Sequence, residues 1–213
     1  MSAEDLKQAA TFSDHLERLP LRERKKRRTR MALQNQALRL FSEQGYEATT
    51  MEQIAAAAEV SASTAFRYFP TKEDLVIQDE YDPFMLELFR AQPPELSPIE
   101  ALRSMFGEAL PHLYERDRAQ LTARIQLMAT VPSIKSRFFN AMRGNTLAVI
   151  DQVIAERVGR DPKDPEVECF AWAVTGSLYA AMFSWLESDG ELELPELVDR
   201  NLKFLAAGCP LGA

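Results

Sequence analysis

A short polar stretch in the N-terminal third of the chain has the residue types that hydrogen-bond to nucleic acid. Ser61, Ser63 and Thr64 carry hydroxyls, Arg67 carries a guanidinium and Tyr68 a phenol. Hydroxyl groups bind phosphate oxygens or base edges, and a guanidinium can donate two parallel hydrogen bonds to O6 and N7 of guanine. We therefore interpret Arg67 as the residue that reads a base.

These side chains need a rigid support, and the flanking sequence predicts one. Apolar residues from Leu33 to Phe41 recur at helical spacing, and Gly45 ends that helix. Two short helices are expected over 51–58 and 62–69, with Pro70 after the second. The expected core is Leu40, Phe41, Met51, Ile54, Val60 and Phe69. A long helix followed by two short ones joined by a tight turn is typical of a helix-turn-helix unit.

Charge is distributed unevenly along the chain. The net charge is -7, yet the segment from Arg18 to Lys72 holds eleven Lys/Arg against five Asp/Glu. A cationic run, Arg22–Arg30, precedes the long helix. Such a run is by itself more often a solvated surface, but a basic segment on an acidic body indicates a polyanionic partner for that segment.

The order and spacing of these motifs resemble the tetracycline-repressor (TetR) family over about residues 24–76. The resemblance is carried by Ala37-Leu-Arg-Leu-Phe41, Gly45-Tyr46, Ala48-Thr-Thr50, Ile54-Ala55, Val60-Ser61 and Phe66-Arg-Tyr-Phe-Pro-Thr-Lys-Glu-Asp-Leu75. It implies that the helix beginning near Ser61 is the recognition helix and that Thr50, Tyr68 and Lys72 bind phosphates. One departure is Glu59, where the turn usually has Gly. If that position needs a positive φ, Glu costs about 1 kcal/mol there.

The complete set of predicted DNA-binding residues combines these contacts with the cationic run. It comprises Arg28, Arg30, Thr49, Thr50, Ser61, Ser63, Thr64, Arg67, Tyr68 and Lys72. Single members have a structural alternative: Thr50 could merely cap a helix, Tyr68 could be half-buried core, and Arg67 and Lys72 could be ordinary solvated charges. Their combination favours DNA binding.

The remaining chain is expected to be helical and to form a dimer. Helices are predicted near 99–115, 119–131, 133–158, 166–186 and 194–207. One apolar stripe on the fourth of these comprises Val167, Ala171, Val174, Leu178, Ala181, Met182 and Trp185. Because small residues, Ala173, Gly176, Ser177 and Ala180, are interspersed, the last two helices are expected to form a four-helix interface with their dimer mates. The alternative is an internal core helix.

A ligand pocket is expected among bulky side chains of the middle helices. The candidates are Phe84, Leu88, Phe89, Met105, His112, Arg124, Met128, Phe138, Phe139 and Met142, with Arg124 as an anion anchor. Met and Phe at such positions are more often plain core, and a lone histidine is more often structural than a metal ligand. The runs at 79–83 and 131–137 resemble the TetR subgroup that binds acyl-CoA-like ligands and is related to mycofactocin-system regulators.

Other classes find little support in the sequence. Cys169 and Cys209 lie far apart and are expected to be free thiols, and no signal peptide, membrane span, metal-ligand spacing or glycine-rich phosphate loop is recognisable. No catalytic residue, metal or cofactor is therefore predicted.

The sequence predicts an all-α cytoplasmic homodimer with three parts. These are a flexible N-terminal arm (1–21), a three-helix helix-turn-helix DNA-binding domain (22–75) and a C-terminal helical ligand-binding and dimerisation domain (76–213). The expected partners are a double-stranded DNA operator and a small-molecule effector, acyl-CoA-like or otherwise apolar, and no membrane. The expected function is a transcription repressor that its effector releases from DNA. The alternatives are a ligand-independent dimeric DNA-binding protein and a small all-α enzyme or carrier.

Overall fold

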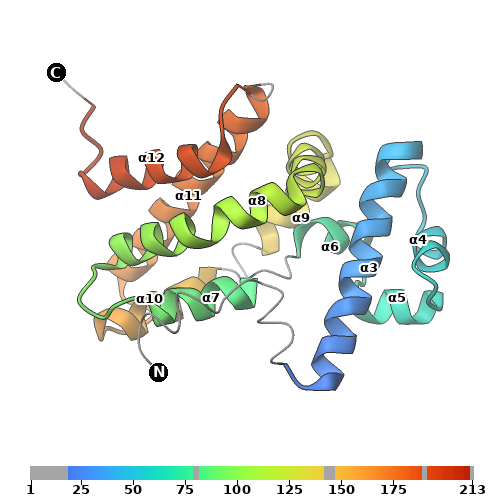
Figure 1. The fold of residues 1–213 in the computed structure, drawn as a ribbon, viewed down its shortest axis with the longest axis horizontal. Helices are drawn as coiled ribbons and strands as arrows, with labels where there is room; N and C mark the ends of the chain where they lie inside the picture. Colours follow the sequence, from blue (N-terminus) through green and yellow to red (C-terminus); the bar gives the residue numbers. More distant parts are fainter. Residues whose placement is uncertain (1–18, 79–81, 142–146, 189–190, 212–213) are drawn as a thin grey trace. The chain divides into compact units, whose positions relative to one another are not determined.

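The computed structural model describes residues 19–78, 82–141, 147–188 and 191–211, and every regular element in these ranges is an α-helix (Figure 1). The helices are α3 (Leu21–Gln44), α4 (Met51–Ala57), α5 (Ala62–Tyr68), α6 (Lys72–Ile77), α7 (Asp82–Ala91), α8 (Pro98–Thr130), α9 (Pro132–Ala141), α10 (Leu147–Val158), α11 (Pro165–Glu187) and α12 (Leu194–Ala206). The predicted all-α class is confirmed. Most of the predicted arm, residues 79–81 of the acyl-CoA-like run and Met142 lie outside the described residues.

The chain divides into two compact units. The first contains the described residues up to Phe84 together with Ala119–Phe138, and the second contains Met85–Arg118 and the described residues from Phe139 onward. Helix α8 contributes to both, and Asp117, with φ of -121° and ψ of 22°, interrupts its helical backbone next to the division. The break predicted between 115 and 119 coincides with this residue. The division of the chain differs from the predicted boundary after residue 75.

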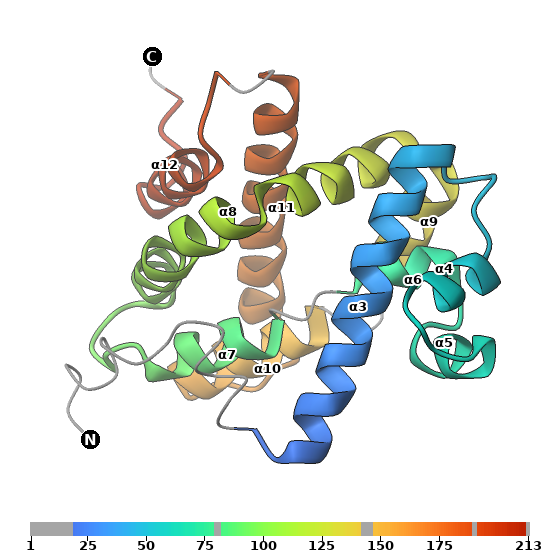
Figure 2. The same cartoon turned by 45° about the vertical axis from the view of Figure 1, so that its right-hand side comes forward.

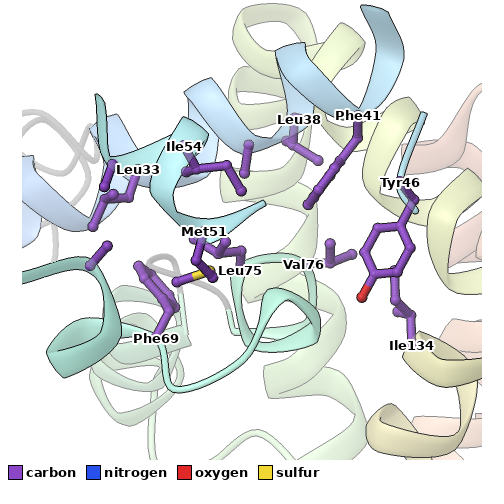
Figure 3. Close-up of a cluster of buried hydrophobic side chains, with 13 residues drawn as sticks. Leu33, Leu38, Phe41, Tyr46, Met51, Ile54, Phe69, Leu75, Val76 and Ile134 are labelled. Atoms are coloured by element: carbon purple, nitrogen blue, oxygen red, sulfur yellow. The ribbon is translucent and has the colours of Figure 1, made fainter. Parts of the chain in front are cut away.

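An apolar cluster holds the first unit together (Figure 3). Helix α3 contributes Leu33, Ala37, Leu38 and Phe41, and α4 contributes Met51, Ile54 and Ala55. Phe69, at the end of α5, is fully buried. The predicted core is confirmed, although Leu40 and Val60 are only half-buried at its margin.

The three short helices of this unit begin at side-chain caps. The hydroxyls of Thr50, Ser61 and Thr71 accept hydrogen bonds from backbone amides in the first turns of α4, α5 and α6, respectively. Such caps satisfy amides that a helix cannot bond internally and stabilise by about 1 kcal/mol each. Because helices of seven residues or fewer are marginal alone, these caps and the shared core fix where each begins.

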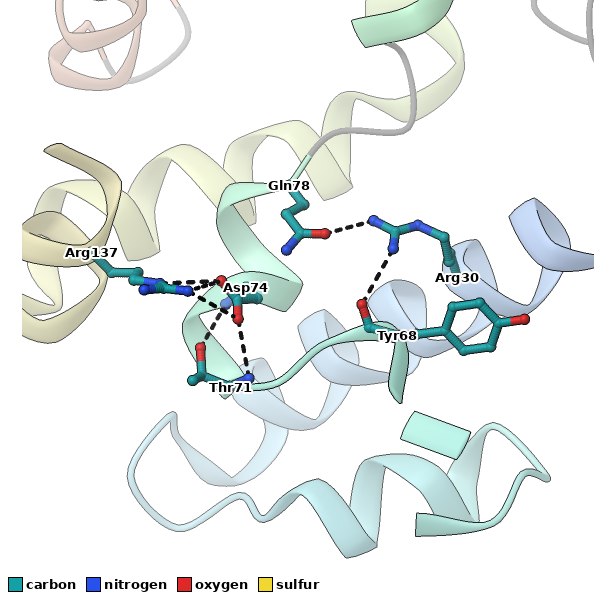
Figure 4. A network of polar contacts seen from close by, with 6 residues as sticks. All are labelled: Arg30, Tyr68, Thr71, Asp74, Gln78 and Arg137. Atoms are coloured by element: carbon teal, nitrogen blue, oxygen red, sulfur yellow. Dashed lines mark hydrogen bonds and ion pairs between the residues drawn. The ribbon is translucent and has the colours of Figure 1, made fainter. Parts of the chain in front are cut away.

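Helix α6 links the helix-turn-helix to residues 119–138 of the same unit. Arg137 of α9 forms an ion pair with the buried Asp74, 3.1 Å from Nη2 to Oδ1 (Figure 4). Arg124 of α8 donates to the backbone carbonyls of Val76 and Gln78. Ile134 of α9 also belongs to the core cluster. These contacts explain why residues distant in sequence pack with the N-terminal helices.

The second unit packs α10, α11 and α12 with α7 and the first part of α8. Its cluster includes Phe89, Met105, Ile154 and Val167. Trp185 of α11 donates a hydrogen bond to the Tyr114 hydroxyl of α8 at 3.1 Å, and the two rings meet edge to face. An edge-to-face pair adds to area burial, so this contact fixes α8 against α11.

Helix α11 buries, inside its own chain, the face that was predicted to form the dimer interface. The stripe from Val167 to Trp185 is largely buried inside the chain, so for this stripe the alternative, an internal core helix, holds. The exposed face carries Trp172, Gly176, Ala180 and Phe183, which follow at i, i+4, i+8 and i+11. We call these four residues the free face of α11.

Length and composition alone would allow α11 to cross a membrane. The buried helices of folded proteins meet the same test, and α11 packs against α10 and α12. Asn201 of α12 donates to the backbone carbonyl of Ser177, which adds a polar contact to the α11–α12 pair. The exposed Cys169 and Cys209 are free, as predicted.

Candidate nucleic-acid interface

Helix α5 presents its predicted contact residues on one side. Ser63 and Arg67, one helical turn apart, are exposed, Thr64 is half-buried, and Ala65 faces the core. Ser61 Oγ accepts from the amide of Thr64 at 3.2 Å and lies 3.0 Å from Ser63 Oγ. The cap therefore fixes the backbone at the start of α5 and gathers the hydroxyls there.

Tyr68 ends α5 with its backbone held and its ring half-buried. Arg30 of α3 donates to the Tyr68 carbonyl at 3.3 Å (Figure 4). The phenol ring extends away from this contact, and the Arg67 guanidinium lies 5.5 Å from the centre of the ring. A held backbone with a projecting ring suits a residue that positions the helix on phosphate.

The two adjacent threonines before α4 differ in their environments. Thr50 is exposed, and its Oγ1 accepts from the Gln53 amide at 3.2 Å, so the hydroxyl hydrogen can be directed to another acceptor. Thr49 is only 1% exposed, and its hydroxyl donates to the Gly45 carbonyl at 2.8 Å. Thr49 was predicted to bind DNA, but its side chain is buried and its hydroxyl closes the loop after α3.

Lys72 is engaged with the loop in front of α4. Its ammonium donates to the backbone carbonyls of Tyr46 and Thr49, both at 2.9 Å, and lies 4.4 Å from the centre of the Tyr46 ring. An ammonium has three donors, so one remains for a phosphate. Lys72 thus holds the loop that sets the position of Thr50.

The two predicted cations of α3 also differ. Arg28 is exposed, whereas Arg30 is half-buried and donates to Oε1 of Gln78 at 2.7 Å and packs over the Phe69 ring at 4.4 Å (Figure 4). The geometry therefore gives Arg30 a structural role: it fastens α3 to the ends of α5 and α6.

One exposed residue of α5 was not among the predicted contacts. Phe66 is 43% exposed and lies next to Arg67. An exposed aromatic ring can make apolar contact with a thymine methyl group. The helical spacing could have predicted this exposure. Ala65 and Phe69 are four residues apart on the buried face, and Phe66 falls outside that face.

The predicted ligand-binding residues are divided between the two units. Phe84, Arg124, Met128 and Phe138 belong to the first, and Leu88, Phe89, Met105, His112 and Phe139 to the second. Phe89 and Met105 are buried in the second core cluster, Leu88 packs on its edge, and Met128 packs against the first cluster. These four residues occupy core positions.

Three of the predicted ligand residues have other environments. His112 and Phe139 are exposed, the latter by 53%, because each lies on the outward side of its helix. Arg124 donates to backbone carbonyls at the end of α6. Its guanidinium therefore has a structural function beside any role toward an anion.

A shallow cavity of about 440 Å³, open to solvent, lies at the surface of the second unit between α7 and α10. Its lining is Arg90, Ala148, Val149, Gln152 and Val153. Arg90 donates to Glu156 at 3.2 Å, and Gln152 donates to the other oxygen of the same carboxylate at 3.0 Å. Glu156 therefore holds the two polar groups of the cavity, and its pKa is lowered by the hydrogen bonds from Gln152 and Arg90. None of the ligand-binding residues predicted above is in this lining.

Two family models match the chain. The model of tetR-family bacterial regulatory proteins matches residues 34–78, and the model of the MftR C-terminal domain matches residues 96–210. Together they cover the helix-turn-helix and most of the helical region behind it.

Curated relatives are transcription regulators. The chain is 34% identical to the HTH-type transcriptional regulator TcmR of Streptomyces glaucescens over 154 residues, 68% of this chain and 66% of TcmR. It is 20% identical to the fatty acid metabolism regulator protein of Bacillus subtilis over 190 residues, 87% of this chain and 97% of that protein. The chain spans 61% of a third relative, the transcriptional repressor KstR of Rhodococcus jostii, with 28% identity.

Solved structures of the same fold include two FadR proteins. Thermus thermophilus FadR in complex with lauroyl-CoA gives a TM-score of 0.56 at 24% identity, over 86% of this chain and 96% of that one. Bacillus subtilis FadR in complex with stearoyl-CoA gives 0.57 at 20% identity, over 84% and 98%. Through the two family models, this chain belongs to the TetR family of bacterial regulatory proteins, which are DNA-binding transcription regulators and not enzymes.

Proposed function

We propose that this protein is a homodimeric repressor that binds operator DNA through α5 and releases it when a small apolar effector binds. The observation that carries the proposal is the outward face of α5, where Ser63 and Arg67 lie exposed above a buried core. A capped, rigid helix with hydroxyl and guanidinium groups on its free side suits the major groove.

The proposed contacts divide by role. Arg67 reads a base, with Ser63 and Phe66 beside it, whereas Arg28, Thr50, Tyr68 and Lys72 bind phosphates and set the register. Residues 22–75 act as the DNA-binding domain, and residues 76–213 bind the effector and dimerise. With one recognition helix per protomer, two half-sites roughly 34–36 Å apart lie on one face of the duplex.

The operator contact is tested with Arg67→Ala. The operator is first selected from random duplexes by the wild-type chain, and each base pair is then varied singly. We expect Arg67→Ala to lose about 1–3 kcal/mol of binding free energy and to relax the preference at one base pair per half-site. Arg39→Ala on the same unit is the control, because Arg39 pairs with Glu43 at 2.7 Å on the surface of α3. Equal losses on operator and random DNA for Arg67→Ala contradict base reading.

The effector is proposed to be an acyl-CoA or another apolar small molecule. The related FadR structures hold lauroyl-CoA and stearoyl-CoA, and a further structure of the fold, SmeT, holds triclosan. In this chain the cavity between α7 and α10 combines the Arg90 guanidinium with alanine and valine side chains. That lining suits an apolar body, and an anionic end would compete with the Glu156 carboxylate for Arg90.

Release is measured by titrating lauroyl-CoA, lauric acid, free CoA and triclosan into the operator complex. We expect at least one apolar compound to lower DNA affinity tenfold or more, a coupling of about 1.4 kcal/mol. Val149→Trp fills the proposed cavity and should abolish the response while DNA binding stays intact. A ligand-independent DNA-binding protein would bind the operator equally at every concentration of each compound.

Two further properties belong to the proposal. The free face of α11, with α12 beside it, forms the dimer interface, since its aromatic and small residues leave an apolar stripe on the surface of one protomer. The protein is soluble and acts in the cytoplasm, where its operator DNA is found.

A further inference from the structure

The first ten residues of α3 precede its core-facing part and are strongly cationic. Leu21–Arg30, here called the basic extension, holds seven Lys/Arg and one acid, Glu23. The first buried residue of α3 is Leu33, and within the extension Arg22, Lys25 and Lys26 are exposed. The core of the first unit therefore does not explain why the helix continues to Leu21.

Local interactions oppose a helix at this place. Pro20 at the N-cap provides no side-chain hydrogen bond, and Glu23 is the acid of the first turn. The positive end of the helix dipole then coincides with the cationic run, whereas anionic residues are the ones that stabilise a helix N-terminus. Glu23 and Lys26 are 3.9 Å apart with both side chains about half exposed, so this ion pair offsets little of the repulsion.

The extension is placed beside the recognition helix. Arg30, its last residue, contacts the Tyr68 carbonyl and the Phe69 ring at the C-terminal end of α5. In Figures 1 and 2 the N-terminal end of α3 extends past α5 on the side away from α4. From Arg30 to Arg22 the helix rises about 12 Å, at 1.5 Å per residue, which is about the width of the major groove.

We propose that the basic extension is a second DNA-contact surface, in which Arg22, Lys25 and Lys26 bind phosphates that flank the base pairs under α5. This inference rests on the proposed DNA binding by α5. A duplex is favoured over a membrane because successive helical residues are rotated by about 100°, which spreads the cations around the rod and leaves no apolar face. Phosphates spaced along the flank would neutralise the cations and stabilise the helix end.

The test compares two charge-matched variants on two duplexes. Arg22→Gln with Lys25→Gln removes two cations from the extension, and Lys135→Gln with Lys163→Gln removes two exposed cations elsewhere. The probe is the duplex selected by the wild-type chain, either trimmed to its half-sites or extended by about ten base pairs, one helical turn, at each end. Affinity is measured across a salt series, and amide hydrogen exchange of residues 21–30 is followed on both duplexes.

On the extended duplex, we expect the extension variant to lower the slope of log affinity against log salt by about two per protomer, since each phosphate contact contributes about 0.9. The control pair should leave the slope unchanged, and both proteins should bind the trimmed duplex with similar slopes. Amides 21–30 of the wild-type chain should exchange more slowly on the extended duplex than on the trimmed one.

Three results would overturn the inference. These are an unchanged slope for the extension variant, an equal change of slope on trimmed and extended duplexes, and, in a parallel assay with vesicles of anionic phospholipid, a loss of affinity seen for the vesicles and not for the extended duplex. In the first and third cases operator binding through α5 would stand. A wild-type chain that selects no duplex would overturn the proposed function as well.

Discussion

Glu59, in the turn between α4 and α5, has a backbone conformation that favours glycine. Its φ is 56°, as anticipated from the usual glycine at this place. In this region the Cβ atom crowds the following carbonyl, which costs about 1–2 kcal/mol for most residues other than glycine. The capped helices and the core on either side hold the turn in this conformation. The folded protein therefore keeps the backbone strain at Glu59.

Replacing Glu59 by glycine should therefore stabilise the protein. We expect Glu59→Gly to raise the free energy of unfolding by about 1 kcal/mol, measured by urea denaturation. Glu52→Gly is the matched control, because Glu52 lies in the first turn of α4 and glycine in a helix costs about 1 kcal/mol. A Glu59→Gly variant less stable than the wild type would show that the Glu59 side chain makes a compensating contact.

Asp151 of α10 provides a second prediction at the level of single residues. Its Oδ1 is buried without a hydrogen-bond partner among the described residues, and burial, with a smaller contribution from the Glu168 carboxylate, raises its pKa. Because the pKa of this carboxyl is higher in the folded than in the unfolded chain, its protonated form, present at low pH, favours folding. That stabilisation is lost as the pH rises through the folded pKa.

Asp151→Asn should thus stabilise the fold near neutral pH and lose its effect in acid. We expect roughly 1 kcal/mol at pH 7, because the amide of Asn carries no charge that burial would penalise. Below about pH 3.8, the ordinary aspartate pKa, both proteins are neutral at this position and should unfold alike. Unfolding curves of both proteins from pH 3 to 8 measure this dependence, and a constant difference would contradict it.

Among the elements, α6 has the most distinctive environment. It has only six residues, yet Asp74 both caps its first turn through the Thr71 amide, at 3.1 Å, and receives Arg137 from α9. Gln34 of α3 donates to the carbonyls of Leu75 and Gln78 from the other side. A helix this short is positioned by its neighbours, so motion of α9 would reach the DNA-binding helices through it.

The Asp74–Arg137 contact should be worth more than an exposed ion pair. A double-mutant cycle of Asp74→Asn and Arg137→Gln is expected to give a coupling of about 1.5 kcal/mol in unfolding free energy, because Asp74 is almost fully buried. The figure stays below that of a fully buried pair, since Arg137 is half exposed. The exposed Arg39–Glu43 pair should give about 0.5 kcal/mol or less in the same cycle. Similar couplings for the two pairs would contradict a special role for α6.

At the scale of the whole molecule, the proposed dimer requires the free face of α11 to be the surface where two copies meet. A Cβ added at Gly176 has no atom within 4 Å, so a longer side chain there fits one protomer without a clash. With a longer side chain at this position, a helix of a second protomer could no longer pack closely against α11. A substitution at Gly176 therefore tests dimerisation without disturbing the fold of one protomer.

Gly176→Glu should fold normally, sediment as a monomer and lose operator affinity at least tenfold, since one half-site then binds alone. Gly107→Glu in α8 is the control, because Gly107 also has open space at its Cβ and is exposed. Sedimentation, circular dichroism and operator titration distinguish the outcomes. A Gly176→Glu chain that remains dimeric would place the interface elsewhere.

The sequence by itself determined the helical class, the helix-turn-helix and the residue types on its free side. It could do so because helical periodicity, caps and turn residues are local signals, and the motif from Phe66 to Leu75 orders them in a short span. The core from Leu33 to Phe69 was predictable for the same reason.

Only the tertiary structure decided which of these polar side chains form hydrogen bonds inside the protein and which remain exposed. Thr49 and Thr50 are alike in sequence, but one hydroxyl closes a loop and the other lies exposed. Arg30 bonds to partners 38 and 48 residues away, and the face that α11 buries depends on α10 and α12. Local patterns fix which residues share a face, but burial of that face depends on segments brought together from far along the chain.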